Sequence, residues 1–240
     1  MKKVNSLNPI KHFDEIFKRD KQSDRYIARL PRFISHFLGY RSHEGQQLLP
    51  FLKYISKDTE INILGWIGSF VGIALLIAVF SYSNDLVNWN PYIVPSMGAS
   101  AVLVFGTFES PFAQPRNLIF GHFISALIGV IFQRLFSLNS GYNPSESAIH
   151  GAMEVGQLAW FAASLATASA VAAMHFTGTT HPPAGATALI ATTMPSIVSY
   201  SWRYLATLLI SSTLMLGWAL IWNNLSSRRY PVYWITPDRS

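Results

Sequence analysis

The chain has 240 residues, of which 50% are hydrophobic and only 12% are charged. Soluble domains usually carry about 25% charged residues, so the composition excludes an ordinary soluble globular domain. The net charge is +6, but 12 of the 18 Lys and Arg residues lie in the first 57 positions. A basic head before an apolar body is typical of the positive-inside bias and argues against nucleic-acid binding. There is no cysteine, which excludes disulfide and thiolate chemistry.

Residues 1–60 are predicted to form a basic cytoplasmic head. No short apolar run opens the chain, so no cleavable signal peptide is expected. Between Tyr26 and Leu38, apolar residues recur at three- and four-residue spacing and arginines flank them. This pattern predicts an amphipathic helix lying in the membrane interface, kinked or started by Pro31. The alternative is a surface helix that packs on the body.

Residues 61–225 are predicted to form the transmembrane domain, and residues 226–240 a short cytoplasmic tail. About 20 apolar residues suffice to cross a hydrocarbon core of about 30 Å. Four segments meet this length, and two shorter segments each begin near a proline and carry a glycine. The predicted fold is therefore all-α, a polytopic membrane helical bundle with six membrane segments. The long spans are Ile61–Tyr82, Leu118–Leu138, Met153–Phe176 and Trp202–Trp222, and the short segments are Tyr92–Phe108 and His181–Tyr200.

The two short segments align with each other at an offset of 87 residues without gaps. The simplest interpretation is a duplicated unit of long span, short Pro/Gly segment and long span. If the short segments cross the membrane, each unit has three spans and the second copy is inverted, a common transporter plan. The residues paired at this offset include Pro95 and Pro182, Gly98 and Gly185, Ser100 and Thr187, and Arg116 and Arg203.

The short segments could also be re-entrant, which would leave four crossings and parallel repeats. Both counts are even, so both place the N- and C-termini on the cytoplasmic side with the basic head and Arg228–Arg229. The two topologies differ in the loop from Ser137 to Ala152, which is external with six crossings. That loop has no Lys or Arg, which favours the external side.

The short segments contain the ingredients of an anion site at a helix N-terminus. The first backbone N–H groups of a helix have no intrahelical partner and carry partial positive charge. Proline suits the first turn, glycine permits close approach, and a hydroxyl can cap the helix or donate to a ligand. The alternative is that the small residues serve tight helix packing. The predicted substrate-binding residues are Pro95, Gly98, Ser100, His181, Pro182, Pro183, Gly185 and Thr187.

Further polar residues are candidates for charges along a pathway. Arg116 and Arg203 each precede a long span, where they would either snorkel to headgroups or stand at a pathway mouth. Glu154 is either interfacial or a proton-coupling carboxylate. His181 would bond substrate, shuttle a proton, or fix the turn through backbone carbonyls. His122 lies inside a long span, where a helix–helix hydrogen bond is favoured.

At these residues the sequence resembles the HPP family of integral membrane proteins. The resemblance rests on "HPPAGATALIA" and on "PSMGASAVLVFGTFESPFAQPRNLIFGHFISALIGV", and it covers roughly residues 30–225. It implies a bundle of four or more membrane spans and a transporter. Plant and cyanobacterial relatives are linked to nitrite transport, and some members carry C-terminal CBS domains, so nucleotide-type regulation is not expected here.

The resulting hypothesis is an inner (plasma) membrane transporter or channel for a small inorganic anion, with nitrite the leading candidate. The alternative is a non-transporting anchor or assembly subunit that docks a cytoplasmic partner through the basic head. A membrane enzyme is the weakest interpretation, since His150 and Glu154 share only a helical spacing and no nucleophile–base motif appears. The expected partners are the lipid bilayer and the anion, without metal or cofactor, and a homo-oligomer is left open.

Overall fold

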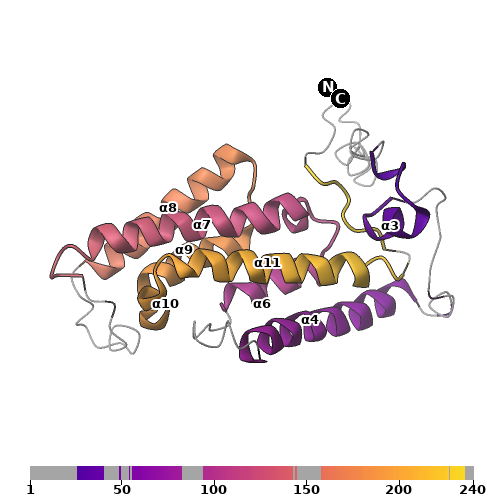
Figure 1. The fold of residues 1–240 in the computed structure, drawn as a ribbon, viewed down its shortest axis with the longest axis horizontal. Coiled ribbons are helices and arrows are strands. Elements are labelled where there is room, and N and C mark those ends of the chain that lie inside the picture. The colour runs from indigo at the N-terminus through magenta and orange to yellow at the C-terminus, as the bar shows by residue number, and fades with distance from the viewer. Residues whose placement is uncertain are drawn as a thin grey trace, which may run out of the picture.

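The structure is a computed structural model that describes residues 26–40, 49, 54, 56–82, 94–142, 144, 158–226 and 228–235. Its described residues form helices joined by turns, and no strand occurs among them (Figure 1). The fold is all-α, as predicted. The elements in chain order are α3 (Arg32–Phe37), α4 (Lys57–Tyr82), α6 (Ser96–Ala101), η2 (Val102–Gly106), η3 (Pro111–Ala113), α7 (Pro115–Phe136), α8 (Ala159–Thr177), α9 (Pro182–Thr193), α10 (Pro195–Tyr200) and α11 (Arg203–Trp222).

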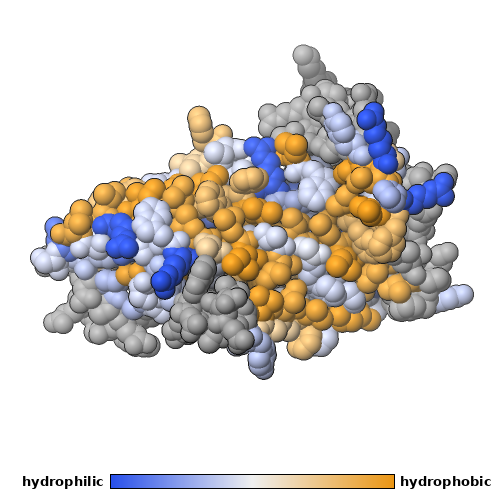
Figure 2. Space-filling model, in the orientation of Figure 1, coloured by the Kyte–Doolittle hydropathy of each residue, from blue (hydrophilic) through white to orange (hydrophobic). Residues whose placement is uncertain are grey.

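Four helices are long and apolar enough to cross a membrane: α4 from Thr59, α7, α8 and α11. They coincide with the four predicted long spans to within a few residues, apart from the start of the third, which falls outside the described residues. Figure 2 shows a broad hydrophobic band over these helices, with strongly hydrophilic side chains toward the ends. Large apolar side chains such as Trp66, Phe70 and Trp160 are exposed on this surface, as lipid contact requires.

The two predicted Pro/Gly segments form short helices. The first is α6 continued by η2, a π-helical turn, and together they run from Ser96 to Gly106. At about 1.5 Å per residue this helix is roughly 16 Å long, about half of a hydrocarbon core. The second is α9, which ends where Met194 turns extended before Pro195, and α10 follows. A proline excludes its preceding residue from helical geometry, which explains the break.

The direction of each helix follows from its contacts and from Figure 1. The indole N–H groups of Trp222 and Trp218 donate to the carbonyls of Leu64 and Gly68, so α11 runs antiparallel to α4. The start of α7 likewise contacts the end of α8, where Arg116 bonds the carbonyl of Thr177. Consequently α4 and α7 run one way through the bundle, and α8 and α11 run the other way (Figure 1).

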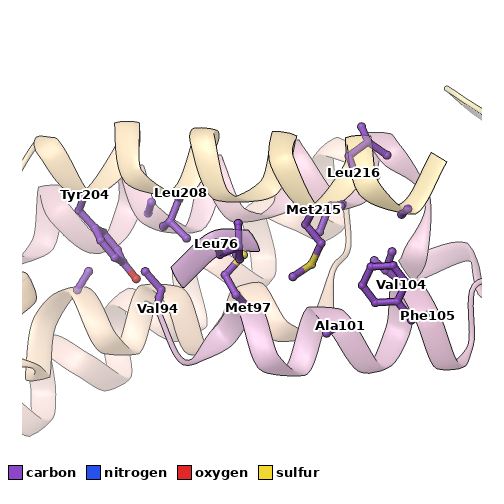
Figure 3. Close-up of a cluster of buried hydrophobic side chains, with 14 of the residues drawn as sticks. Leu76, Val94, Met97, Ala101, Val104, Phe105, Tyr204, Leu208, Met215 and Leu216 are labelled. Atoms are coloured by element: carbon purple, nitrogen blue, oxygen red, sulfur yellow. The ribbon is translucent and has the colours of Figure 1, made fainter. Parts of the chain in front are cut away.

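The hydrophobic core lies between α6, η2, α4, α7 and α11. Figure 3 shows the sequence from Val94 to Phe105 lying beside the sequence from Tyr204 to Leu216 in the same order, so α6 and α11 run parallel. Met97, Phe105 and Met215 are fully buried there. This core fixes the short helix inside the bundle and leaves its first turn directed at α9.

The head helix α3 begins directly after Pro31, which occupies its N-cap. It contacts the segment after α11: a ring nitrogen of His36 lies 2.7 Å from the carbonyl oxygen of Asn224, and the Asn224 amide donates to the carbonyl of Phe37 at 3.2 Å. The Trp234 indole N–H donates to the carbonyl of Leu38. Several large apolar side chains of this region remain exposed, among them Phe33 and Tyr26. The helix thus docks on the body while retaining an apolar outer face.

Candidate functional site

Five polar side chains form one buried hydrogen-bonded network where α6, α7 and α9 meet, and we call it the His–hydroxyl network. His122 is at its centre: Nε2 lies 2.8 Å from Ser100 Oγ, and Nδ1 lies 2.8 Å from Thr187 Oγ1. Ser100 Oγ is also 2.9 Å from His181 Nε2, and Thr187 Oγ1 is 2.9 Å from Ser96 Oγ. Ser96 is 3% exposed and the other four are 0% exposed, so bulk water does not reach the network.

The network exists because the first turns of α6 and α9 lie side by side. Ser96 contacts Thr187 and Ser100 contacts His181, so residue numbers rise along α6 in the direction in which they fall along α9. The two short helices are therefore antiparallel and overlap by their N-terminal turns. Three of the sequence-predicted site residues, Ser100, His181 and Thr187, meet here. The predicted helix–helix hydrogen bond of His122 is present as well, and it joins α7 to both short helices.

Two glycines of α7 allow α9 to approach closely. A Cβ on Gly121 would lie 2.7 Å from the Cβ of His181, and a Cβ on Gly129 would lie 2.7 Å from the Cβ of Ala191. Contacts this short do not occur for real side chains, so any larger residue would push the helices apart. Because the residue numbers rise together along both helices, α7 and α9 run parallel. The glycine beside His122 thus sets the distance between the two imidazoles, whose ring centroids are 4.9 Å apart.

Backbone N–H groups at the two helix starts are mostly absent or already bonded. Pro182 and Pro183 have no N–H, and the N–H of Ala184 donates to the carbonyl of His181 at 2.8 Å. In α6, the N–H groups of Met97 and Gly98 donate to carbonyls three residues back. An anion at this point would therefore meet hydroxyl and imidazole N–H donors more than free backbone N–H groups. The helix dipoles still direct positive potential toward it.

The predicted prolines and glycines lie around the network without joining it. Pro95 and Pro182 are exposed at the starts of the two short helices, and Pro183 is buried. Gly98 is exposed and Gly185 is partly exposed, and a Cβ at either position would meet no atom within 4 Å. Neither glycine is required for helix packing inside this chain, so the packing interpretation does not account for them.

The predicted pathway charges stand at separate places. Arg116 donates to the carbonyl of Thr177 at 2.6 Å and to that of Ile235 at 3.2 Å, which caps the C-terminal end of α8. Arg203 is exposed at the start of α11, near the opposite end of the bundle. Glu154, and His150 with it, lie outside the described residues.

The C-terminal ends of the short helices are held by side chains from elsewhere in the chain. Asn223 donates to the carbonyl of Val104 at 2.9 Å, and Arg228 donates to that of Phe105 at 3.1 Å. At the end of α9, the Tyr142 hydroxyl donates to the carbonyl of Thr192 at 2.7 Å. Burial raises the pKa of Tyr142 to about 12, so this hydroxyl keeps its proton. Both half-length helices thus end inside the protein with satisfied carbonyls, as a membrane interior requires.

A groove of about 680 Å³ lies elsewhere, between α4 and η2. Its lining is mainly apolar and includes Trp66, Phe70, Ile73 and Val102, and no member of the His–hydroxyl network contributes to it. Groups of three or more metal-ligating side chains do not occur in the part of the chain that the structure describes. The His–hydroxyl network is therefore separate from this groove.

Several residues of the site were not predicted from the sequence. Ser96 closes one end of the network, and the carbonyl of Phe112 accepts from His181 Nδ1 at 2.8 Å at the other end. Tyr204 donates to the carbonyl of Thr187 at 3.1 Å from α11. A signal for Ser96 was present, because it stands one helical turn before Ser100 and shares its face. Gly121 adjoins His122, but nothing in sequence says which element a glycine faces.

The comparisons with known proteins agree on a membrane family. The family model described as "HPP, transmembrane region" matches residues 56–231. Two curated transmembrane proteins of Dictyostelium discoideum are each 37% identical to the chain. The first match covers 199 residues, 78% of this chain and 58% of the relative, and the second covers 175 residues, 70% of this chain and 54% of the relative. The chain thus spans little more than half the length of these relatives. No solved structure matches it.

The family match covers all four candidate membrane spans and the whole His–hydroxyl network. It includes both helix starts from which that network is built. The chain is therefore an integral membrane protein, and it belongs to the HPP family.

Proposed function

We propose that this protein transports a small inorganic anion across the membrane, with the His–hydroxyl network as its substrate site in a closed state. The observation that carries the proposal is the buried meeting of the two short helix starts at Ser100, His122, His181 and Thr187. Polar and ionisable groups inside a membrane are costly and usually mark substrate or ion pathways. The anion would bind between the helix starts when α6 and α9 separate.

The proposed architecture is a pair of inverted repeats, α4–α6–α7 and α8–α9–α11. The burial of the two short helices supports this interpretation at the offset of 87 residues. Each buried position of the first helix matches a buried position of the second at that offset, and the pattern continues through η2. The matched buried positions are Ser96, Met97, Ser100, Ala101, Val104 and Phe105 in one helix and Pro183, Ala184, Thr187, Ala188, Ala191 and Thr192 in the other.

Packing between the units supports the same symmetry. The short helix of each proposed repeat runs parallel to the last helix of the other repeat: α6 beside α11, and α9 beside α7. The first helix of each repeat runs antiparallel to the same partner, α4 to α11 and α8 to α7. Two units related in this way could rock against each other about the point where their short helices meet, which is how inverted-repeat transporters expose a site alternately.

We further propose that the head and the segment after α11 face the cytoplasm. The docked helix α3 and Arg228 lie at the end of the bundle where α4 and α7 begin. The positive-inside bias assigns that end to the cytoplasmic side of a plasma membrane. The loop after α7 would then be external.

Nitrite is the leading substrate, as the resemblance to the HPP family implies. A monovalent oxyanion accepts hydrogen bonds, and the network offers two hydroxyl groups from α6, one from α9 and two imidazole rings. Helix N-termini add positive potential without a fixed cationic side chain, which suits a weakly held, transported anion.

The test is flux into liposomes that contain the purified protein. Nitrite, nitrate, formate and chloride should be compared with protein-free vesicles, at a pH where nitrous acid leak is small. Thr187→Val removes a network hydroxyl while keeping its shape, and we expect the rate to fall at least tenfold. Thr192→Val is the matched control, because the Thr192 hydroxyl bonds only carbonyls of its own helix.

The rival function is a non-transporting membrane anchor. One observation favours it: the network is fully closed, and its hydroxyls and rings already satisfy one another. If wild-type vesicles pass none of the four anions, the anchor is the better interpretation and the transport proposal fails.

A further inference from the structure

The hydrogen bonds of the His–hydroxyl network have a direction, and one backbone carbonyl sets it. The carbonyl oxygen of Phe112 can only accept, so His181 Nδ1 must carry the hydrogen of that bond. A neutral His181 then has a bare Nε2, which needs a donor. Ser100 is 2.9 Å away and has one hydroxyl hydrogen, so Ser100 donates to His181.

The same reasoning fixes the direction of the other hydrogen bonds in the network. With its hydrogen committed to His181, Ser100 Oγ can only accept from His122, so the hydrogen of His122 is on Nε2. His122 Nδ1 is then bare and accepts from Thr187, whose oxygen in turn accepts from Ser96. Five side chains therefore form a single-file chain in which each donates one hydrogen toward Phe112.

The opposite direction fails when both rings are neutral. If Ser100 donated to His122, no hydrogen would be left for His181 Nε2, and two lone pairs would face each other at 2.9 Å. The reversed chain becomes complete when His181 holds a second proton, because Nε2–H can then donate to Ser100. The two directions of the network thus differ by one proton.

We propose that the network is a proton relay that loads His181 and makes anion transport proton-coupled. A proton arriving at Ser96 Oγ displaces the Ser96 hydrogen to Thr187, and the Thr187 hydrogen passes to His122 Nδ1. The Nε2 hydrogen of His122 passes to Ser100, and the Ser100 hydrogen passes to His181 Nε2. One proton has entered, His181 has become an imidazolium, and each of the four bonds between side chains has reversed, while His181 Nδ1–H still donates to Phe112. Every bond in this path is between 2.8 and 2.9 Å long.

Ser100 also has an alternative acceptor that helps His181 keep the proton. Its hydroxyl lies 3.1 Å from the backbone carbonyl of Ser96, one turn back in α6. When the Ser100 hydrogen rotates to this carbonyl, the Ser100 oxygen is left free to accept from His181 Nε2–H. The protonated ring therefore finds acceptors on both nitrogens, Ser100 on one side and Phe112 on the other.

The helices around the network supply no competing acid, and two carboxylates stand on neighbouring elements: Glu60, buried near the start of α4, and Glu109, exposed between η2 and η3. Helices α6, α7, α8, α9 and α11, with η2, contain no Asp or Glu over their described lengths. Their other titratable groups are Tyr204 on α11, which donates to the network through the carbonyl of Thr187, and His175, which is exposed at the end of α8. The remaining charges on these helices are Arg116 beside the carbonyl of Thr177, Arg134 beside Ser201, and Arg203. Within these described helices, His122 and His181 are therefore the buried bases available to carry a proton.

The proposal deepens the transport function and rests on it. An imidazolium at the meeting point of two helix starts would attract an anion, and a neutral network would release it. One anion and one proton would then move together, and a proton gradient would drive anion accumulation.

The tautomers can be measured without any transport assay. Protein labelled with ¹⁵N-histidine, in lipid bilayers, should show His181 protonated at Nδ1 and His122 protonated at Nε2 at alkaline pH, with assignments from single His→Gln variants. On acidification, His181 should gain its second proton while the protein stays folded. A neutral Nε2–H tautomer at His181, or a ring that takes no proton at any pH at which the fold persists, would overturn the proposal.

The coupling is tested in liposomes with nitrate, which has no membrane-permeant acid form near neutral pH, and with nitrite. An acidic exterior should drive wild-type uptake above the equilibrium level, with proton entry reported by an internal pH dye. In His181→Gln the amide can still bond Phe112 but does not titrate, so we expect uphill uptake to fall at least tenfold and the pH gradient to stop driving it. His175→Gln is the control and should retain wild-type uphill uptake.

The outcomes separate the two proposals. Wild-type flux that ignores the pH gradient leaves anion transport standing and refutes proton coupling, as does uphill uptake by His181→Gln. Absence of any wild-type flux refutes transport itself. If His181→Gln does not fold, wild-type uphill uptake and the histidine tautomers still decide the matter.

Discussion

Removal of the Ser100 hydroxyl is the sharpest stability test of the site. Ser100 Oγ is the atom that joins His122 to His181, so Ser100→Ala leaves one bare nitrogen and one N–H without partners in a region closed to water. Each buried orphan group costs about 1–3 kcal/mol. Hydrogen bonds measured inside a membrane protein average about 0.6 kcal/mol, because the unfolded chain also finds partners. Two lost bonds should therefore destabilise the fold by about 2 kcal/mol, roughly a 30-fold change in the folded ratio.

The matched control is Ser212→Ala. Ser212 is also 0% exposed, but its hydroxyl donates only to the carbonyls of Leu208 and Leu209 in its own helix. Its loss orphans no other side chain, and we expect a change within about 0.5 kcal/mol. Unfolding by SDS titration from mixed micelles, followed by tryptophan fluorescence, measures both variants. If Ser100→Ala is no less stable than Ser212→Ala, the network does not hold α6, α7 and α9 together.

Two further predictions concern packing and topology. Gly121→Ala would place a Cβ 2.7 Å from the Cβ of His181, and it should destabilise the fold by about 1–3 kcal/mol in the same SDS titration. Its control is Gly98→Ala, whose Cβ would meet no atom within 4 Å, and this variant should be neutral or slightly stabilising. Equal effects of the two variants would contradict the packing of α7 on α9. The chain has no cysteine, so a single cysteine can be placed at Leu138 or at Ile235, both of which are exposed. The two cysteines should react with a membrane-impermeant maleimide from opposite sides of the membrane. Labelling of both positions from the same side would refute the inverted topology.

The sequence was sufficient for the long helices, and the reason is physical. A membrane span must satisfy its backbone internally and bury apolar side chains in lipid, so length and hydropathy alone define it. The starts of the short helices were also predictable, since a proline stands at each of them: Pro95 is the N-cap of α6, and Pro182 is the first residue of α9. Even the break at Pro195 has a local signal, although it was not predicted.

The contacts of the site were less accessible from sequence. Ser100 and His181 are 81 residues apart, and their meeting depends on the parallel packing of α9 against α7. A helix that is apolar all round does not reveal which face it buries, so the roles of the glycines could not be assigned. Gly98 and Gly185, which the motif made prominent, face open space, whereas Gly121 provides the close approach.

The same geometry explains why the site is polar and yet closed. Two prolines remove N–H groups from the start of α9, and the hydroxyls of Ser100 and Thr187 bond the two imidazoles. An anion can enter only if these bonds open, so substrate must compete with the hydroxyls of the protein itself. Since a neutral network has one hydrogen-bond direction and a protonated one has the other, protonation changes which atoms are available as donors. Substrate binding and proton uptake at His181 therefore act on the same few bonds, and a gate between α6 and α9 would respond to both.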